Sequence, residues 1–198
     1  MKMFLIFIIV IGIIIGGIIV LQKSDNTKIS SQILPIANTS TQASVDTSSI
    51  LNENKPAPEF VGITKWLNPE KSLTRQSLKG KVVLIDFWTN QCINCIHTLP
   101  YVTKWYDKYK NQGFVVIGVH TPELAYERTV GSVEQAIATY GIHYPVALDN
   151  DYATWKAYDN QYWPAAYLID KKGVIRRTHF GEGEYDETEQ AIQTLLKE

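Results

Sequence analysis

Two cysteines, Cys92 and Cys95, are the residues of this sequence whose type and spacing are best suited to chemistry. They are the only cysteines in 198 residues, and at the start of a helix they would lie about one turn apart. A thiol in the first turn of a helix faces unpaired backbone N–H groups and the positive end of the helix dipole, which lower its pKa. We therefore expect Cys92 to be a nucleophile and Cys95 to resolve a mixed disulfide by attacking Cys92.

Other uses of the cysteine pair remain open. A c-type haem site needs a histidine directly after the second cysteine, but Ile96 occupies that position ahead of His97. A zinc site needs four ligands, so a distant histidine such as His120, His143 or His179 would have to join this segment. A copper-binding protein could combine the two cysteines with one distant histidine, although such proteins usually space their cysteines more widely. We expect no bound metal ion and no organic cofactor.

A buried strand and a helix are expected on either side of the cysteine loop. Residues 82–88 form a short apolar run rich in β-branched side chains, as in strands buried on both faces. Residues 93–111 favour a helix, with Pro100 inside it and Gly113 ending it. Residues 114–119 form a second buried run, and two strands joined by a helix usually pair in parallel. The cysteines should therefore lie where the first strand leads into the helix.

The rest of the chain continues the alternation of short strands and longer helices. Ser132 with Gln135, and Asp186 with Glu189, have the spacing of capping boxes at helix starts. The expected fold class is α/β, with a central mixed β-sheet flanked by helices. The later elements are a helix from Ser132 to Tyr140, a strand from Tyr144 to Leu148, a short helix through Ala157, a hairpin of residues 165–169 and 174–178, and a last helix from Asp186.

The first residues predict a membrane segment. Met3 to Leu21 are 19 consecutive uncharged, mostly apolar residues flanked by Lys2 and Lys23, enough for a helix to cross a hydrocarbon core. A cleaved signal peptide is the alternative, but no A-x-A type cleavage site follows this stretch. We therefore expect residues 1–22 to be an uncleaved, single-pass transmembrane signal anchor.

Two further regions follow the apolar segment. Residues 23–55 are dominated by Ser, Thr, Asn, Gln and Asp, which predicts a flexible polar linker. Residues 56–198 carry the regular α/β pattern and have the length of one domain. Once Lys2 and Lys23 are set aside, 17 basic residues face 20 acidic ones, so no basic surface for nucleic acid is expected.

Several motifs together resemble a known family. Residues 79–88 (KGKVVLIDFW), followed by the cysteine pair, resemble the active-site strand and helix of thioredoxin-like proteins. The similarity sharpens toward the thioredoxin-like domain of DipZ-type cytochrome c biogenesis proteins, which are TlpA-like thiol-disulfide oxidoreductases. It extends from about Pro56 to the end, and its motifs are CINC at 92–95, TLPY at 98–101, GVHTPE at 118–123, ALDNDYATW at 147–155 and YWPA at 162–165.

The resemblance implies roles for three further residues. Pro164 matches the family's cis-proline, whose loop lies against the cysteine pair and offers backbone groups to an extended substrate chain. Asp86 matches a buried acid that moves a proton to or from the resolving cysteine, although a solvated carboxylate at a strand end is the alternative. Trp88 matches an aromatic residue beside the site, and core packing would equally explain it.

Glu123 is an expected site residue for a different reason. It closely follows the predicted strand of residues 114–119. Because the carboxyl ends of parallel strands meet at one edge of a sheet, its carboxylate is expected near the cysteine helix.

Two departures from the thioredoxin pattern leave the direction of electron flow open. The residues between the cysteines are Ile93 and Asn94 rather than Gly-Pro, and this dipeptide influences redox potential. Gln91 replaces the tryptophan that general thioredoxins place before the first cysteine.

The sequence therefore predicts thiol-disulfide exchange with protein substrates through a Cys92–Cys95 redox pair, in cytochrome c maturation or in disulfide reduction. DipZ-type proteins fuse this domain to an electron-carrying membrane domain, so a lone apolar segment implies a separate membrane-embedded partner. The catalytic domain is expected on the extracytoplasmic side of a bacterial cell membrane. A thiol peroxidase, in which Cys95 condenses with a sulfenic acid on Cys92, and a copper-binding assembly factor remain the alternatives.

Overall fold

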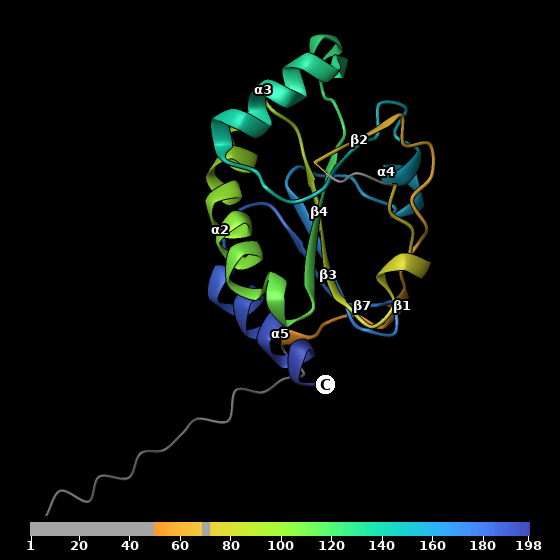
Figure 1. The fold of residues 1–198 in the computed structure, drawn as a ribbon, viewed down its shortest axis with the longest axis vertical. Coiled ribbons are helices and arrows are strands. Elements are labelled where there is room, and N and C mark those ends of the chain that lie inside the picture. Colours follow the sequence, from red (N-terminus) through yellow and green to blue (C-terminus); the bar gives the residue numbers. More distant parts are fainter. Residues whose placement is uncertain (1–49, 69–71) are drawn as a thin grey trace, which may run out of the picture. The chain divides into compact units, whose positions relative to one another are not determined.

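The computed structural model describes residues 50–68 and 72–198 (Figure 1). The predicted anchor of residues 1–22 and nearly all of the predicted linker lie outside the described residues. In the described part, no helix is long and apolar enough to cross a membrane.

Within residues 50–68 and 72–198, seven strands form one mixed sheet in the order β1-β7-β6-β3-β4-β5-β2. The adjacent strands β3, β4 and β5 run parallel, and all other neighbouring strands pair antiparallel. The predicted mixed α/β sheet is therefore confirmed. The strands are β1 (Lys55–Pro56), β2 (Lys65–Leu67), β3 (Val82–Trp88), β4 (Phe114–His120), β5 (Val146–Leu148), β6 (Ala165–Ile169) and β7 (Val174–Phe180).

Helices cover both faces of this sheet. In Figure 1, α2, α3 and α5 lie together on one side, and the short α4 lies on the other. The helices are α2 (Ile93–Tyr109), α3 (Val130–Tyr140), α4 (Ala153–Ala157) and α5 (Tyr185–Lys197), with 3-10 turns η1 (Gln76–Leu78), η2 (Lys110–Gln112) and η3 (Ala125–Arg128).

The central strand β3 divides the core into two layers because successive side chains point to opposite faces. Leu84 and Trp88 pack with residues of α2, α3 and α5, whereas Ile85 and Phe87 pack against Trp155 of α4. All seven residues of β3 are buried, which explains its nearly uninterrupted apolar sequence. The exception in that sequence is Asp86, which alternation places on the same face as Leu84 and Trp88.

Most predicted elements are confirmed, while two predicted helix starts are wrong. Helix α3 is capped by Thr129, whose side chain accepts a hydrogen bond from the Ser132 N–H, so Ser132 is not the cap. Helix α5 follows Glu184, whose φ is +48° and whose side chain makes no capping hydrogen bond. The preceding loop turns left-handed through Gly181 and Gly183, so the chain enters this helix without a side-chain cap.

The close approach of β4 to its neighbours generates a prediction about Gly118. A Cβ atom at this position would lie 2.9 Å from Trp88 Nε1 and 3.1 Å from Tyr144 Cε2. Since both rings are buried, Gly118→Ala should lower the free energy of unfolding by about 1–3 kcal/mol in urea titrations. Gly131→Ala is the matched control, because no atom of the described chain lies within 4 Å of a Cβ there. Equal stability of the two variants would contradict the packing argument.

Candidate active site

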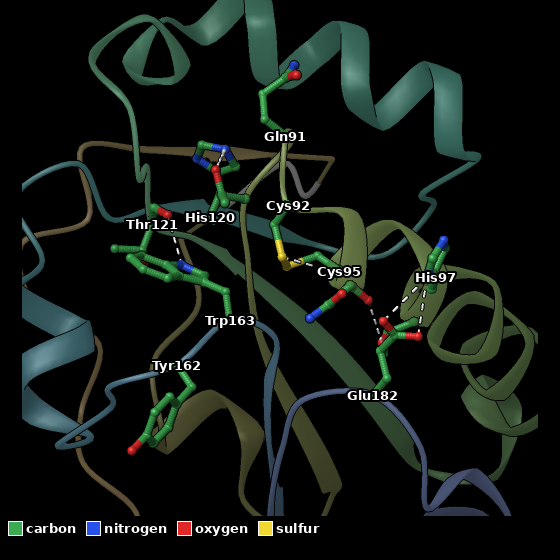
Figure 2. The surroundings of a disulfide bond; sticks show 12 residues. Gln91, Cys92, Cys95, His97, His120, Thr121, Tyr162, Trp163 and Glu182 are labelled. Carbon is green, nitrogen blue, oxygen red and sulfur yellow. Dashed lines mark hydrogen bonds and ion pairs between the residues drawn. A yellow bond between two sulfur atoms is a disulfide. The ribbon is translucent and has the colours of Figure 1, made fainter.

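The two cysteines form a disulfide at the start of α2, with their Cα atoms 5.2 Å apart (Figure 2). Cys92 caps the helix, and its sulfur accepts a hydrogen bond of 3.1 Å from the Cys95 N–H. Cys95 is only 1% exposed, whereas Cys92 is partly exposed. An incoming sulfur can therefore reach Cys92 first, which supports the expected order of nucleophile and resolver.

Cys92 occupies the cap position that Ser, Thr, Asp or Asn usually fills. Its backbone is extended, so the chain leaves the loop after β3 and turns directly into the helix. The first turn of α2 contains no acidic residue that would offset the helix dipole. In the reduced protein, the first-turn N–H groups and the dipole would stabilise a thiolate on Cys92.

Asp86 lies on β3 and is 1% exposed. Its Oδ1 has no hydrogen-bond partner among the described residues, and burial raises the pKa of its carboxyl to about 7. Asp86, Thr98 of α2 and Pro164 line one cavity, with about 10 Å³ open to the centre of a water molecule. This volume suits about one water. Asp86 can therefore exchange a proton near neutral pH beside the cysteine helix.

The Trp163–Pro164 peptide bond is cis, as the family resemblance implied. The loop is fixed on both sides: the Gly181 N–H donates to the Pro164 carbonyl over 2.8 Å, and the Trp163 indole N–H donates to the Thr121 carbonyl over 3.1 Å. Figure 2 shows Trp163 and Thr121 beside the disulfide, with His97 and Glu182 on the other side. The loop thus has a fixed position next to the exposed sulfur.

Trp88 packs beneath the site. Its side chain is fully buried in the same core cluster as Cys95, and its ring meets His120 edge-on at 5.2 Å between centroids. The indole is therefore part of the core against which α2 packs, and it is not on the surface that a substrate could contact.

Glu123 is exposed, and no side-chain hydrogen bond or ion pair involves it among the described residues. The buried acid in this segment is Glu127, which is 0% exposed. Its two carboxylate oxygens accept hydrogen bonds from the Gln91 N–H at 3.2 Å and the Leu124 N–H at 2.6 Å. Sequence reasoning missed Glu127. Its one signal was the spacing from Leu124, three residues earlier, but a capping box normally begins with Ser or Thr.

His120, which the sequence offered as a possible metal ligand, proves to be a core residue. It is fully buried at the end of β4, with Nε2 3.5 Å from the Thr89 hydroxyl. Burial lowers the pKa of its imidazole to about 4, although nearby Glu127 opposes this effect. His120 is therefore neutral at pH 7. His97 instead lies on the surface, with Nδ1 3.2 Å from the Glu182 carboxylate.

The described residues 50–68 and 72–198 contain no group of three or more His, Cys, Asp and Glu side chains arranged to hold a metal ion. His97 is close to the cysteines in sequence, but its nearest acidic partner is Glu182.

The redoxin family model matches residues 52–196, which include every residue of the candidate active site. The chain belongs to the redoxin family. Its domain is 54% identical over 144 residues to the protein DipZ of Mycobacterium bovis, covering 72% of this chain and 21% of DipZ. It is 34% identical to the thiol-disulfide oxidoreductase YkuV of Bacillus subtilis, covering 73% of this chain and 96% of YkuV.

Solved structures agree with this assignment. A crystal structure of a thioredoxin-like superfamily protein aligns with a TM-score of 0.68 at 32% identity, covering 73% of this chain and 97% of that protein. This redoxin domain therefore has a thioredoxin-like fold and is similar to proteins named thiol-disulfide oxidoreductases. It spans about a fifth of the length of DipZ (21%).

The high pKa of Asp86 generates a prediction about stability. An unfolded chain loses this proton near its ordinary pKa of 3.8, whereas the folded redoxin keeps it to about pH 7. Between these values the folded state binds more protons, so stability falls as the pH rises. Asp86→Asn stays neutral and should be more stable than the parent at pH 8, by on the order of 2–4 kcal/mol.

Urea unfolding of the oxidised protein at pH 4.5 and pH 8 measures this difference. Asp151→Asn is the matched control because that carboxylate is exposed, and it should change stability little at either pH. If Asp86→Asn were instead less stable than the parent at pH 8, the ionised Asp86 carboxylate would not destabilise the folded protein, and the prediction would be wrong.

Proposed function

We propose that this redoxin is a membrane-anchored enzyme that exchanges disulfides with protein substrates on the extracytoplasmic side of a bacterial cell membrane. The observation that carries the proposal is a partly exposed Cys92, disulfide-bonded to a fully buried Cys95, at a helix start beside the cis Pro164 loop. This arrangement gives one sulfur access to a substrate and keeps the other in reserve.

In the reducing direction, the Cys92 thiolate attacks one sulfur of a substrate disulfide. A bond forms between Cys92 and that sulfur, the substrate disulfide breaks, and the leaving sulfur takes up a proton as a thiol. Cys95 then loses its proton and attacks the Cys92 sulfur, which forms the Cys92–Cys95 disulfide and releases the second substrate thiol. Two electrons pass from the enzyme pair to the substrate. In the oxidising direction the same steps run in reverse.

Asp86 is suited to the second step. The buried Cys95 must lose a proton before it can attack, and a thiol in apolar surroundings holds its proton tightly. Asp86 titrates near neutral pH and shares a cavity with Thr98, one turn after Cys95 on α2. The proposed route is a water in that cavity that relays the proton between the Asp86 carboxylate and the Cys95 thiol, although Cys95 itself does not line the cavity.

The surface next to Cys92 suits an extended polypeptide. Ile93 is 60% exposed and Tyr162 is 55% exposed, and the Tyr162 ring packs against Phe180, itself 46% exposed. Such apolar side chains can cover a substrate segment while the Pro164 loop offers backbone groups to it. Protein disulfides in extended or partly unfolded segments are therefore the proposed substrates.

The membrane part of the proposal is supported by the sequence. Residues 3–21 are uncharged and mostly apolar, with the length of a transmembrane helix. The similarity to DipZ favours a role in cytochrome c maturation or in disulfide reduction. A membrane-embedded electron-transfer partner is proposed to exchange electrons with the Cys92–Cys95 pair.

A trapping experiment tests the exchange with proteins. In cells that express full-length Cys95→Ser, the mixed disulfide on Cys92 cannot be resolved, so reductant-sensitive adducts with other proteins should accumulate on non-reducing gels. Cys92→Ser is the matched control and should trap none, because the buried Cys95 is inaccessible. The proposal would be falsified if Cys95→Ser formed no adducts while the reduced wild-type protein consumed peroxide rapidly.

Fractionation tests the anchoring. The full-length protein should remain with membranes after alkaline extraction, and deletion of residues 3–21 should release it. In intact cells, a membrane-impermeant thiol reagent should label Cys92 of the full-length protein after mild reduction. Labelling only after cell lysis would place the domain on the cytoplasmic side and contradict this part of the proposal.

A further inference from the structure

The mechanism above does not use Glu127, although this residue is the acid most closely tied to the loop in front of the disulfide. Glu127 lies in η3, between β4 and α3, and is 0% exposed. Its Oε1 accepts a hydrogen bond from the backbone N–H of Gln91, which lies 36 residues earlier and immediately before Cys92. A buried acid thus holds the loop that positions the attacking sulfur.

Both oxygens of Glu127 are occupied by backbone donors. Oε1 accepts from the Gln91 N–H at 3.2 Å, and Oε2 accepts from the Leu124 N–H at 2.6 Å. Only a carboxylate offers two equivalent acceptor atoms in this way, because a glutamine would present one oxygen and one amide nitrogen. The side chain therefore connects the loop before Cys92 to the segment after β4.

The groups around Glu127 leave its charge largely unbalanced inside the protein. The charge of Glu127 raises the pKa of His120 on β4, but burial lowers this pKa by more, so the imidazole is neutral at pH 7. Tyr152, which precedes α4 and whose hydroxyl donates to the Pro122 carbonyl, is also within reach of this charge and is uncharged. Arg128, the adjacent cation, is exposed, where solvent weakens its effect. Glu123 and Asp149, the other charged groups that act on Tyr152, are also acids and do not balance Glu127. Through the Gln91 N–H, Glu127 contacts the residue immediately before Cys92.

We propose that Glu127 is a positioning residue that fixes the turn before Cys92 and, through its negative charge, opposes ionisation of the Cys92 thiol in the reduced enzyme. The inference rests on the proposed exchange reaction, in which Cys92 is the nucleophile. The first turn of α2 has no acidic residue, so the helix dipole strongly stabilises a thiolate on Cys92. The charge of Glu127 would offset part of this stabilisation. The reactivity of the pair is then set by two opposed electrostatic effects.

The pH dependence of alkylation measures the ionisation of Cys92 directly. In the reduced full-length protein, iodoacetamide should react mainly with Cys92, since Cys95 is buried. Glu127→Gln removes the charge and should move the midpoint of the rate profile down by about one pH unit, so the rate below both midpoints rises about ten-fold. Glu134→Gln on α3 is the matched control, because its carboxylate is exposed beside Lys65; its midpoint should equal that of the parent.

A second variant separates charge from structure. Glu127→Asp keeps the charge and should leave the midpoint close to that of the parent, even if the shorter side chain lowers stability. A midpoint that stays unchanged or rises in Glu127→Gln overturns the inference, and so does an equal downward shift in Glu127→Asp. If Glu127→Gln does not fold, amide exchange in the wild type decides: the Gln91 and Leu124 amides should be protected, and fast exchange of both overturns it. These measurements need no substrate, so they are independent of the trapping experiment.

Discussion

The rest of the site depends on the start of α2, where a single hydrogen bond both caps the helix and positions the reactive sulfur. The Cys95 N–H donates to the Cys92 sulfur over 3.1 Å, so the side chain that reacts is also the side chain that caps the helix. The helix can begin there only because β3, buried along its full length, delivers the chain to that edge of the sheet. Residues distant in sequence meet at this edge because β4 and β6 flank β3, with His120 opposite Trp88 and Ala165 opposite Phe87.

Two buried carboxylates accompany the pair, and they differ in how the protein treats them. Asp86 has an oxygen without a partner in the described chain, so it holds its proton to about pH 7 and is suited to proton transfer. Glu127 has a backbone donor for each oxygen, so it is suited to keeping a charge in place. The same functional group thus serves two purposes that depend on the backbone around it.

The fold was largely predictable from sequence because its central strands are short apolar runs separated by longer segments that favour helices. The parallel pairing of β3 with β4 and the β6–β7 hairpin followed from segment order and connection length. The short edge strands β1 and β2 were not predicted, since two or three residues carry too little pattern. The cap of α3 was misplaced because Thr129 as well as Ser132 could fit the sequence rule. The start of α5 was misplaced because this helix has no side-chain cap for the rule to find.

The site was predictable where a residue's position in a motif decides its role, as for Cys92, Cys95 and the cis Pro164. It was not predictable for Glu127, which acts through a backbone N–H 36 residues earlier in the chain. No spacing rule relates those two positions. The burial of Trp88 and the exposure of Glu123 likewise depend on tertiary packing, which sequence alone left open.

The short strands at the two edges of the sheet have a consequence for the proposed disulfide exchange with other polypeptides. β1 has two residues and β2 has three, so each edge strand itself presents few unpaired N–H and C=O groups. A long, exposed edge strand would allow an extended polypeptide to pair with the sheet as an additional strand, which promotes aggregation. In the proposed exchange reaction, such short edge strands would leave the backbone beside Pro164 as the place where a substrate segment aligns, next to the disulfide.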